Sequence, residues 1–321
     1  MATKNNNLHT AKKQKNDEFY TQLTDIEQEL KHYKEHFRNK VIYCNCDDPI
    51  ESNFFKYFSL NFEHLGLKKL ISTGYKENGK GVVYIYEGDK NGNRMPDFEE
   101  IEVKELQGNG DFRSAECIEF LKESDIVVTN PPFSLFRDYV ATLVEYGKQF
   151  LIIGNNNAIG YKEIFPLIKE NKLWLGVNSN KTMEFRLPNH YEKWNRIEND
   201  VKIGKVPAIS WFTNLEHKKR NYLMDLYMKY SNEYYKKYDN FDAIEVSKTC
   251  EIPMDYEGIM GVPITFLDKY NPNQFEIIDL CNRYLVLDSF GVNDIVRKNH
   301  SHCCNINNKA TYARILIRHK K

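Results

Sequence analysis

The sequence has few of the residues that mark fibrous, low-complexity or membrane proteins. Its 321 residues include 16 glycines and 10 prolines, too few for a collagen-like or disordered chain, and 41% are hydrophobic. No apolar run approaches the roughly 20 residues that a membrane span needs. The polar start, Met-Ala-Thr-Lys-Asn-Asn-Asn, lacks the apolar core of a signal peptide. We therefore expect a globular cytoplasmic protein, large enough for one core and an appended lobe.

The cysteines do not form a recognisable metal or disulfide pattern. There are 7, an odd number in a chain without a secretory signal, which favours reduced thiols. Cys44 and Cys46 have no second pair at zinc-finger spacing, and His302-Cys303-Cys304 is too small a cluster for a tetrahedral site. Pro96-Asp97 followed by Glu102-Val103-Lys104 resembles a nuclease metal site, but these acids fall within one charged strand region. The sequence therefore predicts no metal.

Charge is balanced overall and uneven along the chain. The 45 basic residues equal the 45 acidic ones. From Arg297 to the last residue there are basic residues and no acid, whereas acids gather between Glu87 and Glu105. A neutral chain that separates charge in this way can present a basic face to nucleic acid. Solvated termini are the alternative.

Up to about residue 213 the pattern alternates between short apolar strands and amphipathic helices. The expected strands are 41–46, 69–72, 125–129, 150–153 and 173–177. The expected helices are 24–38, one that begins near Pro49 and includes Phe62, 114–123, 134–146 and 161–170. A hairpin is expected from 82–86 and 100–104. This alternation indicates a mostly parallel α/β sheet, whose ligands bind at the carboxyl ends of its strands.

The regular alternation ends after Trp211-Phe212-Thr213. Residues from about 216 onward are rich in Tyr and Lys and show no regular period. We therefore predict a first domain over residues 1–215 and a smaller, irregular region over 216–321.

One segment indicates chemistry. The apolar strand Asp125–Thr129 continues directly into Asn130-Pro131-Pro132-Phe133 and then into a helix. The two prolines fix φ and lack N–H groups, so the turn is rigid and leaves its carbonyls as acceptors. The Asn oxygen and a proline carbonyl can accept both protons of a planar exocyclic amine, while Phe133 stacks on the base. A simple strand-terminating turn is the alternative, but its place at the end of a buried strand favours catalysis.

Three further segments carry a family resemblance. They are Asp17-Glu18-Phe19-Tyr20-Thr21, the stretch Cys46–Phe54 after the first strand, and Gly110-Asp111-Phe112. Together with Asn130–Phe133, they make the chain resemble the EcoRI-type family of adenine-specific DNA methyltransferases over most of its length. Ser52 and Asn53 stand where a glycine-rich loop is usual.

The resemblance implies a Rossmann-like α/β fold that binds S-adenosyl-L-methionine, with a smaller irregular C-terminal region for target recognition. Catalysis is expected from Asn130, Pro131, Pro132 and Phe133. Cofactor contacts are expected from Phe19, Tyr20, Thr21, Asp47, Asp48, Asp111, Phe112 and Asn130. Asp48 and Asp111 have helix capping as their alternative role, and Phe19 and Tyr20 have core packing. Phe185 and Phe212 are further candidates for stacking on the target base, each also typical of a core.

The predicted function is site-specific methylation of the exocyclic amino group of a flipped-out adenine in double-stranded DNA. The resemblance further implies a monomer that protects host DNA beside a cognate restriction endonuclease. Basic residues expected to contact DNA are Lys218, Lys219, Arg220, Arg314 and Arg318. The same chemistry on a protein glutamine amide or on RNA, a DNA-binding protein with an inactive cofactor pocket, and a nuclease–methylase fusion remain as alternatives.

Overall fold

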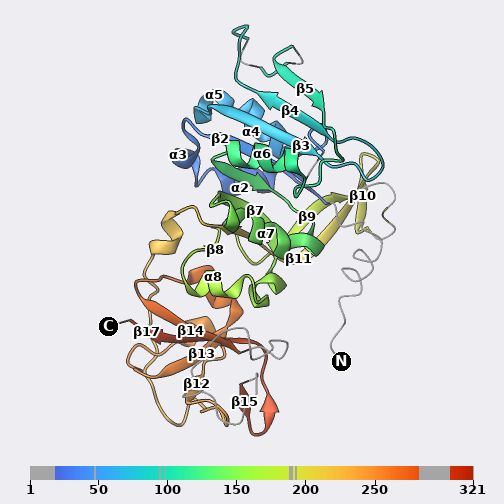
Figure 1. Cartoon of the computed structure of the whole chain (residues 1–321). Helices are drawn as coiled ribbons and strands as arrows, with labels where there is room; N and C mark the ends of the chain where they lie inside the picture. The colour runs from blue at the N-terminus through green and yellow to red at the C-terminus, as the bar shows by residue number, and fades with distance from the viewer. Residues whose placement is uncertain are drawn as a thin grey trace. The chain divides into compact units, whose positions relative to one another are not determined.

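The protein divides into two compact units. The structure, a computed structural model, describes residues 19–46, 48–93, 95–97, 99–187, 191, 194–281 and 304–320. Unit 1 comprises Met1–Asn156 and Gly176–Leu215, and unit 2 comprises Asn157–Leu175 and Glu216–Lys321 (Figure 1). The segment 157–175 therefore clusters with the C-terminal residues rather than with its neighbours in sequence. No helix in the described ranges is long and apolar enough to cross a membrane.

A large sheet forms the centre of unit 1. Its strands are β1 (Tyr20–Thr21), β2 (Val41–Cys44), β3 (Lys69–Gly74), β4 (Val82–Tyr86), β5 (Ile101–Glu105), β6 (Ile126–Thr129), β7 (Gln149–Asn155), β9 (Lys181–Leu187), β10 (Arg196–Glu198) and β11 (Val201–Thr213). They follow the order β1-β9-β11-β7-β6-β2-β3-β4-β5, and β10 pairs with β11. The pairs β7/β6, β6/β2 and β2/β3 are parallel, whereas the strands on either side pair antiparallel. The prediction of a mostly parallel sheet is thus wrong outside the four central strands. On one side β4 and β5, and on the other β11, β9 and β1, add to the sheet in antiparallel orientation.

Helices cover both faces of this sheet. They are α2 (Leu23–Leu30), α3 (Lys34–Phe37), α4 (Asn53–Leu60), α5 (Phe62–Leu65), α6 (Ala115–Glu123) and α7 (Phe136–Glu145). Ile42 and Leu151 belong to the core cluster that also contains Phe54 and Phe58 of α4. Tyr43, the next residue along β2, instead contacts Phe120 of α6 with ring centroids 6.4 Å apart. Alternate strand residues thus pack against opposite helical layers, as the two-residue period of a strand requires.

Two helix predictions are wrong at their boundaries. The helix expected over 24–38 is divided into α2 and α3 at Tyr33, whose backbone leaves helical geometry (φ −120°, ψ 10°) while its buried hydroxyl donates to Glu29 Oε1 at 2.9 Å. The next helix starts at Asn53 rather than at Pro49, since Ser52 Oγ accepts the backbone N–H of Phe54 and forms the N-cap. Pro49 lies in the preceding turn, which the Ser52 N–H closes by donating to the Asp48 carbonyl at 2.7 Å.

Other elements match the sequence pattern more closely. The predicted hairpin is confirmed by β4 and β5, which pair antiparallel. Helix α6 is capped by Ser114 and not by Asp111, the alternative role of that acid. The expected helix over 161–170 is reduced to α8 (Phe165–Lys169) and the expected strand over 173–177 to β8 (Trp174–Leu175).

Unit 2 is more regular than its sequence indicates. Strands β12 (Ala243–Glu245), β13 (Ile259–Pro263), β14 (Phe275–Cys281) and β17 (Arg314–His319) form a sheet in the order β12-β13-β17-β14. The short strands β15 (Asn305–Ile306) and β16 (Lys309–Ala310) pair separately. The prediction of an irregular region is therefore wrong. Long connections and single turns of 3₁₀-helix separate these strands, so the strand–helix alternation on which the prediction depended does not continue here.

Candidate active site

The Asn130-Pro131-Pro132 turn contains a buried hydrogen-bond acceptor, the side-chain oxygen of Asn130. It follows the last residue of β6 and precedes the 3₁₀-helix η1 (Phe133–Leu135) that leads into α7. Asn130 is 5% exposed, and its Nδ2 donates to the Phe19 carbonyl at 2.6 Å. Its Oδ1 is buried and has no hydrogen-bond partner among the described residues. Because the amide nitrogen must face the carbonyl, this bond also fixes the orientation of the unpaired oxygen.

Asn45 connects the elements that carry this turn. It follows β2, and its carbonyl accepts the hydroxyl of Thr129, the last residue of β6. Its side-chain oxygen accepts the hydroxyl of Tyr139 on α7. Complete burial raises the pKa of Tyr139 well above its ordinary value, so this hydroxyl remains a donor. The carboxyl ends of two neighbouring parallel strands are therefore tied to each other and to α7.

Aromatic rings surround the outer side of the turn. Phe133 lies 6.1 Å from Phe19 and 6.4 Å from Phe185 between ring centroids, in edge-to-face arrangements. Tyr191 adds a fourth ring, 5.5 Å from Phe19. The structure thus brings Phe185 to Phe133, whereas Phe212 is fully buried against Phe136 at 5.1 Å. Tyr191 was missed because Pro188-Asn189-His190-Tyr191 carries no periodic or motif signal.

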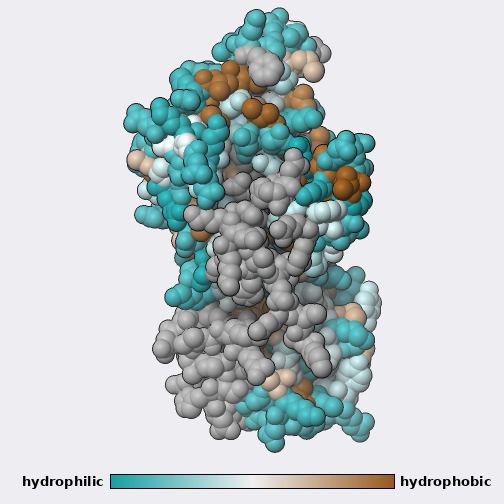
Figure 2. All heavy atoms as spheres, turned by 90° about the vertical axis from the view of Figure 1, so that its right-hand side faces the viewer, coloured by the Kyte–Doolittle hydropathy of each residue, from teal (hydrophilic) through white to brown (hydrophobic). Residues whose placement is uncertain are grey.

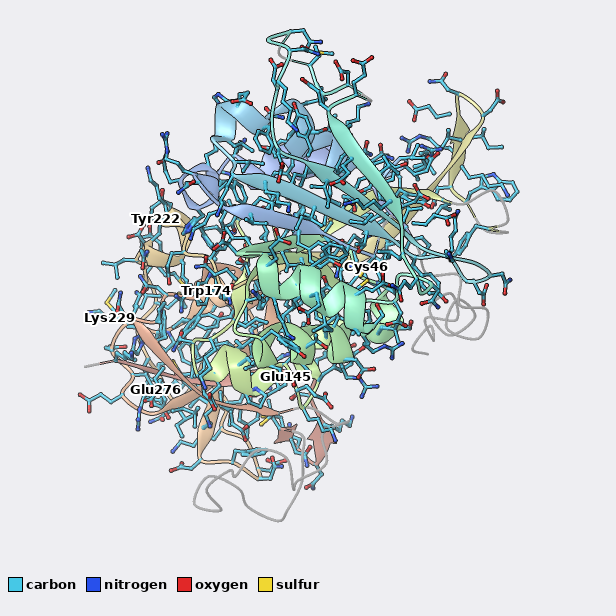
Figure 3. All side chains as sticks on the ribbon, turned by 45° about the horizontal axis from the view of Figure 1, so that its top comes forward. Cys46, Glu145, Trp174, Tyr222, Lys229 and Glu276 are labelled. Carbon is cyan, nitrogen blue, oxygen red and sulfur yellow. The ribbon has the colours of Figure 1, made fainter. Side chains whose placement is uncertain are left out.

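A cavity of about 390 Å³ opens beside the turn in unit 1. It is lined by Cys46, Tyr75, Asn109, Gly110, Asp111, Phe112, Arg113, Pro132, Ser134 and Leu135. Cys46 (Figure 3) lies beyond the carboxyl end of β2, Tyr75 follows β3, and Pro132 belongs to the turn after β6. The cavity is therefore at the edge of the sheet where ligands of parallel α/β folds bind. Gly110 is required in its wall: its φ is +81°, and a Cβ there would lie 2.3 Å from the Gly74 carbonyl oxygen.

Asp111 lines this cavity. Its carboxylate is ionised and can accept one more hydrogen bond. Its Oδ1 accepts the backbone N–H and Nε of Arg113, both at 2.9 Å, and its Oδ2 accepts Nη2 at 2.7 Å. The Arg113 guanidinium thereby holds the pKa of Asp111 below its ordinary value. A carboxylate offers about four acceptor positions, so one remains at Oδ2. Phe112, also in the lining, is held by an edge-to-face contact with Tyr139 at 5.0 Å.

The segment around β1 contributes a second unpaired acceptor. Tyr20 and Thr21 pair with Arg186 and Phe185 of β9. The Thr21 carbonyl accepts Asn53 Nδ2 at 2.7 Å, while the Thr21 hydroxyl oxygen is buried without a hydrogen-bond partner in the part of the chain that the structure describes. Asp48 closes a turn by accepting the Ile50 N–H at 2.9 Å and does not line the cavity, so its cofactor role stays a prediction. The prediction for Asp47 lies outside the described residues.

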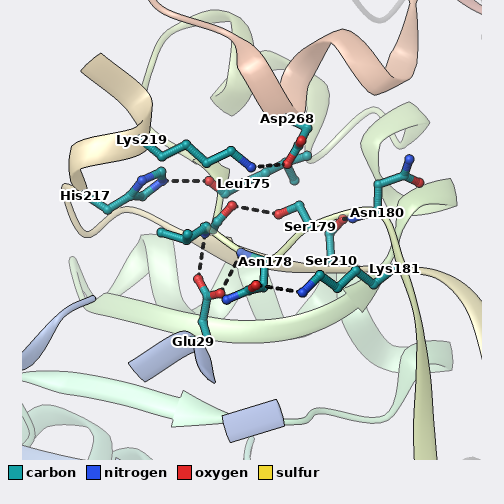
Figure 4. Close-up of polar contacts among 12 residues, drawn as sticks. Glu29, Leu175, Asn178, Ser179, Asn180, Lys181, Ser210, His217, Lys219 and Asp268 are labelled. Carbon is teal, nitrogen blue, oxygen red and sulfur yellow. Dashed lines mark hydrogen bonds and ion pairs between the residues drawn. The ribbon is translucent and has the colours of Figure 1, made fainter. Parts of the chain in front are cut away.

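The basic residues near 216 have different surroundings in unit 2. Lys218 is exposed, and Lys219 pairs with Asp268 at 2.5 Å (Figure 4). The Arg220 side chain is 8% exposed: its guanidinium lies 3.7 Å from the ring centroid of Trp174 and pairs with Glu216 at 2.6 Å. A stacked and paired guanidinium inside a unit stabilises that unit, and it is poorly placed to contact a phosphate.

The basic residues of β17 also differ from each other. Arg314 is 12% exposed and forms a bidentate pair with Glu245, at 2.6 Å from Nη2 and 3.1 Å from Nε. Arg318 is 49% exposed and pairs with Glu276 at 2.7 Å. Of the five basic residues expected to contact DNA, Lys218 and Arg318 thus present their charge to solvent.

Comparison with known proteins identifies the family. A model of the protein family described as "Adenine-specific methyltransferase EcoRI" matches residues 7–320. The chain is 50% identical to the Type II methyltransferase M.EcoRI of Escherichia coli over 98% of this chain and 96% of that protein. It is 44% identical to the Type II methyltransferase M.MpnI of Mycoplasma pneumoniae over 98% of both chains. A further relative, M.MgeORF184P of Mycoplasma genitalium, is 42% identical over 97% of this chain and 98% of its own.

The site and the comparisons together define the protein class. An asparagine–proline–proline turn with an unpaired amide oxygen, next to a cavity at the carboxyl ends of parallel strands, suits methyl transfer to an amino group. The chain belongs to the EcoRI-type family of adenine-specific methyltransferases. The family resemblance stated from the motifs is thereby confirmed.

Proposed function

We propose that this enzyme methylates the exocyclic amino group of adenine at one short sequence in double-stranded DNA, with S-adenosyl-L-methionine as the methyl donor. The observation that carries the proposal is the buried, unpaired Oδ1 of Asn130 beside the 390 Å³ cavity. An unsatisfied buried acceptor costs roughly 1–3 kcal/mol, so its retention needs a partner, and an adenine amino group supplies one. The four parallel strands with helices on both faces support a Rossmann-like arrangement.

The residues of the cavity fit the cofactor. The remaining acceptor position of Asp111 suits the amino group of the cofactor adenine, and Phe112 offers an apolar surface for the ring. The unpaired hydroxyl oxygen of Thr21 is available for a polar group of the cofactor. When bound, the cofactor supplies an electrophilic methyl group on a sulfonium.

The turn and its rings fit the target base. Asn130 Oδ1 and the Pro131 carbonyl accept the two protons of the amino group, which directs the nitrogen lone pair away from the turn. Phe133 stacks on the base, while Phe19, Phe185 and Tyr191 complete an apolar wall that excludes water. An adenine inside a duplex cannot reach this depth, so the base must be flipped out of the stack.

Unit 2 is proposed to recognise the target, and its exposed Lys218 and Arg318 are proposed to contact phosphates. The relatives are named Type II methyltransferases. By analogy, we propose that this chain is the modification enzyme of a restriction–modification system.

Replacement of Asn130 by Ala tests the proposal. In single turnover, Asn130→Ala should lower the rate of methyl transfer roughly 100-fold or more, because it removes the group that orients the amine. Cofactor affinity should stay within about threefold of the parent. Asn61→Ala is a matched control, since the Asn61 amide also bonds a backbone carbonyl, that of Tyr57, at the end of α4. An Asn130→Ala rate within threefold of the parent would show that the turn is not catalytic.

A further inference from the structure

The connection between β4 and β5 carries oxygen-bearing side chains at regular positions. Counted from Asp89 as the first residue, Asn91, Asn93, Asp97 and Glu100 occupy positions three, five, nine and twelve. EF-hand calcium loops take side-chain ligands from positions one, three, five and nine and a bidentate Glu from position twelve. Position seven, which supplies a backbone carbonyl in such loops, is Met95 here. Position six is an arginine in this chain, where EF-hands have glycine.

Glu100 gives an independent indication of a ligand. It is 7% exposed, and its Oε1 accepts the backbone N–H groups of Lys90 at 2.7 Å and Asn91 at 3.1 Å, so the carboxylate is directed into the loop. Its Oε2 is buried with no hydrogen-bond partner among the residues described. A buried carboxylate that is only half satisfied is costly, and a bound cation would satisfy it.

The other carboxylates of the loop accept hydrogen bonds from residues of the same loop. Asp97 Oδ2 accepts the Nδ2 groups of Asn91 at 2.6 Å and Asn93 at 3.3 Å, and Asp89 Oδ1 accepts the Gly92 N–H at 2.6 Å. Within the described ranges, no three Asp, Glu, His or Cys side chains already converge as a metal cage. A cation would therefore replace the two amide groups as the partner of Asp97.

Negative charge accumulates at the base of the loop. Burial raises the pKa of Tyr86, the last residue of β4, and the charges of Glu100, Asp89, Glu63 and Asp97 raise it further, to about 12. These carboxylates thus all lie close enough to Tyr86 to disfavour ionisation of its hydroxyl group. A cation in the loop would offset their negative charge.

We propose that the described residues between Asp89 and Glu100 bind calcium, with ligands from the side chains of Asp89, Asn91, Asn93, Asp97 and Glu100 and the Met95 carbonyl. Flexible, oxygen-only coordination with a bidentate carboxylate suits Ca²⁺, whereas Mg²⁺ requires a near-octahedral shell and retains waters. This proposal departs from the prediction of no metal, which rested on the cysteine spacing and on the Pro96-Asp97 pattern.

The position of the loop makes this a structural site. Tyr86 at the end of β4 pairs with Leu70 near the amino end of β3, so the loop lies at the amino edge of the parallel strands. Asn130 follows the carboxyl end of β6, at the opposite edge. The ion would hold the β4–β5 hairpin together without touching the reacting groups.

Calcium titration of the chelator-treated full-length chain tests the proposal. By calorimetry the parent should bind one Ca²⁺, and Glu100→Gln should weaken binding roughly 100-fold or more, because it removes the bidentate ligand. Gln keeps an oxygen for the Lys90 and Asn91 N–H groups, so this variant should fold. Glu99→Gln, the exposed neighbour at position eleven, should bind like the parent. Asn93→Ala, on the exposed part of the loop, is a second variant expected to weaken binding.

Terbium luminescence gives a second readout. Tb³⁺ in the loop should be sensitised by the nearby Tyr86, and Ca²⁺ should quench the signal by competition. Tyr86→Phe should lower the emission while leaving Ca²⁺ affinity within about threefold of the parent. The proposal is overturned if the parent does not bind Ca²⁺ at millimolar concentration, if Glu100→Gln binds as tightly as the parent, or if Mg²⁺ competes equally well.

Discussion

At the scale of single residues, two arginines that look alike in the sequence differ in how deeply their ion pairs are buried. Arg314 and Arg318 stand four residues apart on β17 and each pairs with a Glu, at 12% and 49% side-chain exposure. Arg314 is enclosed with Glu245 and Tyr238, whereas Arg318 and Glu276 face water. The charge pattern alone assigned both to DNA. The structure indicates that Arg314 stabilises unit 2, whereas Arg318 is exposed enough to contact a phosphate.

Neutralising each arginine should have unequal effects on stability. Arg314→Gln leaves the Glu245 carboxylate buried without its cation, which should lower the free energy of unfolding by about 3–5 kcal/mol. Arg318→Gln removes an exposed pair and should change it by less than about 1 kcal/mol. Chemical denaturation of both variants measures the difference. Equal losses in the two variants would contradict the assignment.

Asp111 offers a test of the cofactor cavity. Asp111→Ala should raise the cofactor dissociation constant about tenfold or more, since a hydrogen bond to a charged group is worth roughly 1.5–3 kcal/mol. Calorimetry with the cofactor measures this directly. Glu119→Ala on the neighbouring helix α6 is the control, because Glu119 is an exposed acid that pairs with Lys122 outside the cavity. Normal binding by Asp111→Ala would place the cofactor elsewhere.

At the scale of elements, buried side chains tie together segments that the sequence leaves separate. Glu29 of α2 is fully buried, and its carboxylate accepts the N–H groups of Val177 and Asn178, each at 2.7 Å (Figure 4). In unit 2, the His217 ring nitrogen Nε2 bonds the Leu175 carbonyl at 2.9 Å. The first contact fixes the path of the chain after Gly176, and the second joins the last residue of β8 to the residue before the 3₁₀-helix Lys218–Asn221.

His217 should make stability depend on pH. Burial lowers its pKa below the ordinary value of 6.5, so the unfolded chain binds the proton more readily. The stability that neutral His217 contributes is present above about pH 6.5 and is lost as the pH falls through the lowered pKa. The Tm measured between pH 8 and pH 5 should therefore drop on acidification, and His217→Gln should reduce that drop. His32→Gln, at an exposed position, is the control. An unchanged profile in His217→Gln would contradict this role.

The elements that the sequence predicted correctly are those whose hydrophobic period is local. Strand β6 and helix α6 each lie within ten residues of the chain, and the hairpin pairs β4 with β5, the next strand along the chain. The Glu29 carboxylate that accepts the Tyr33 hydroxyl is held by the N–H groups of Val177 and Asn178, and the unit 2 sheet requires β13 to pair with β17 across more than forty residues. Such contacts are set by tertiary packing, which no local pattern encodes.

The same limit applies to the site. The Asn130–Phe133 motif is local, so the sequence could propose it, together with Asp111 and Phe112, as a candidate site. Tyr191 and the bonds from Thr129 and Tyr139 to Asn45 join residues more than eighty positions apart. The free acceptor on Asn130 likewise depends on Phe19, far earlier in the chain. The sequence could therefore propose Asn130 as a contact for the target amine, but not the bonds that orient its side chain.

At the scale of the whole molecule, chemistry and target choice are proposed to reside in different units. The described surface is mostly hydrophilic in the view of Figure 2, with hydrophobic side chains in small, separate patches. A polar surface suits a nucleic-acid partner better than a large apolar interface. Unit 2 carries exposed Lys218 and Arg318, and unit 1 carries the cavity and the turn that we propose is catalytic.

A chimera tests this division. Exchanging residues 216–281 for the matching segment of a relative with another target should move the methylated sequence and preserve cofactor affinity. Sequencing that detects methylated bases in DNA from an expressing host reads the outcome. A folded, active chimera that still marks the original sequence would place recognition in unit 1.

Phosphate contacts should appear in the salt dependence of binding. Lys218→Gln should lower the slope of log affinity against log salt by about one unit for any duplex, because one fewer counterion is released. Lys56→Gln, an exposed lysine on α4 of unit 1, should leave the slope unchanged. A parent-like slope for Lys218→Gln would remove this residue from the interface.

The central claim is that the site transfers a methyl group to the amino group of adenine in duplex DNA. Incubating the enzyme with radiolabelled S-adenosyl-L-methionine and equal amounts of duplex DNA, RNA and protein, followed by nucleoside analysis, tests it directly. We predict label in the DNA alone, as N6-methyladenine, and its loss with Asn130→Ala. Label on cytosine, on RNA or on a protein amide would contradict the account.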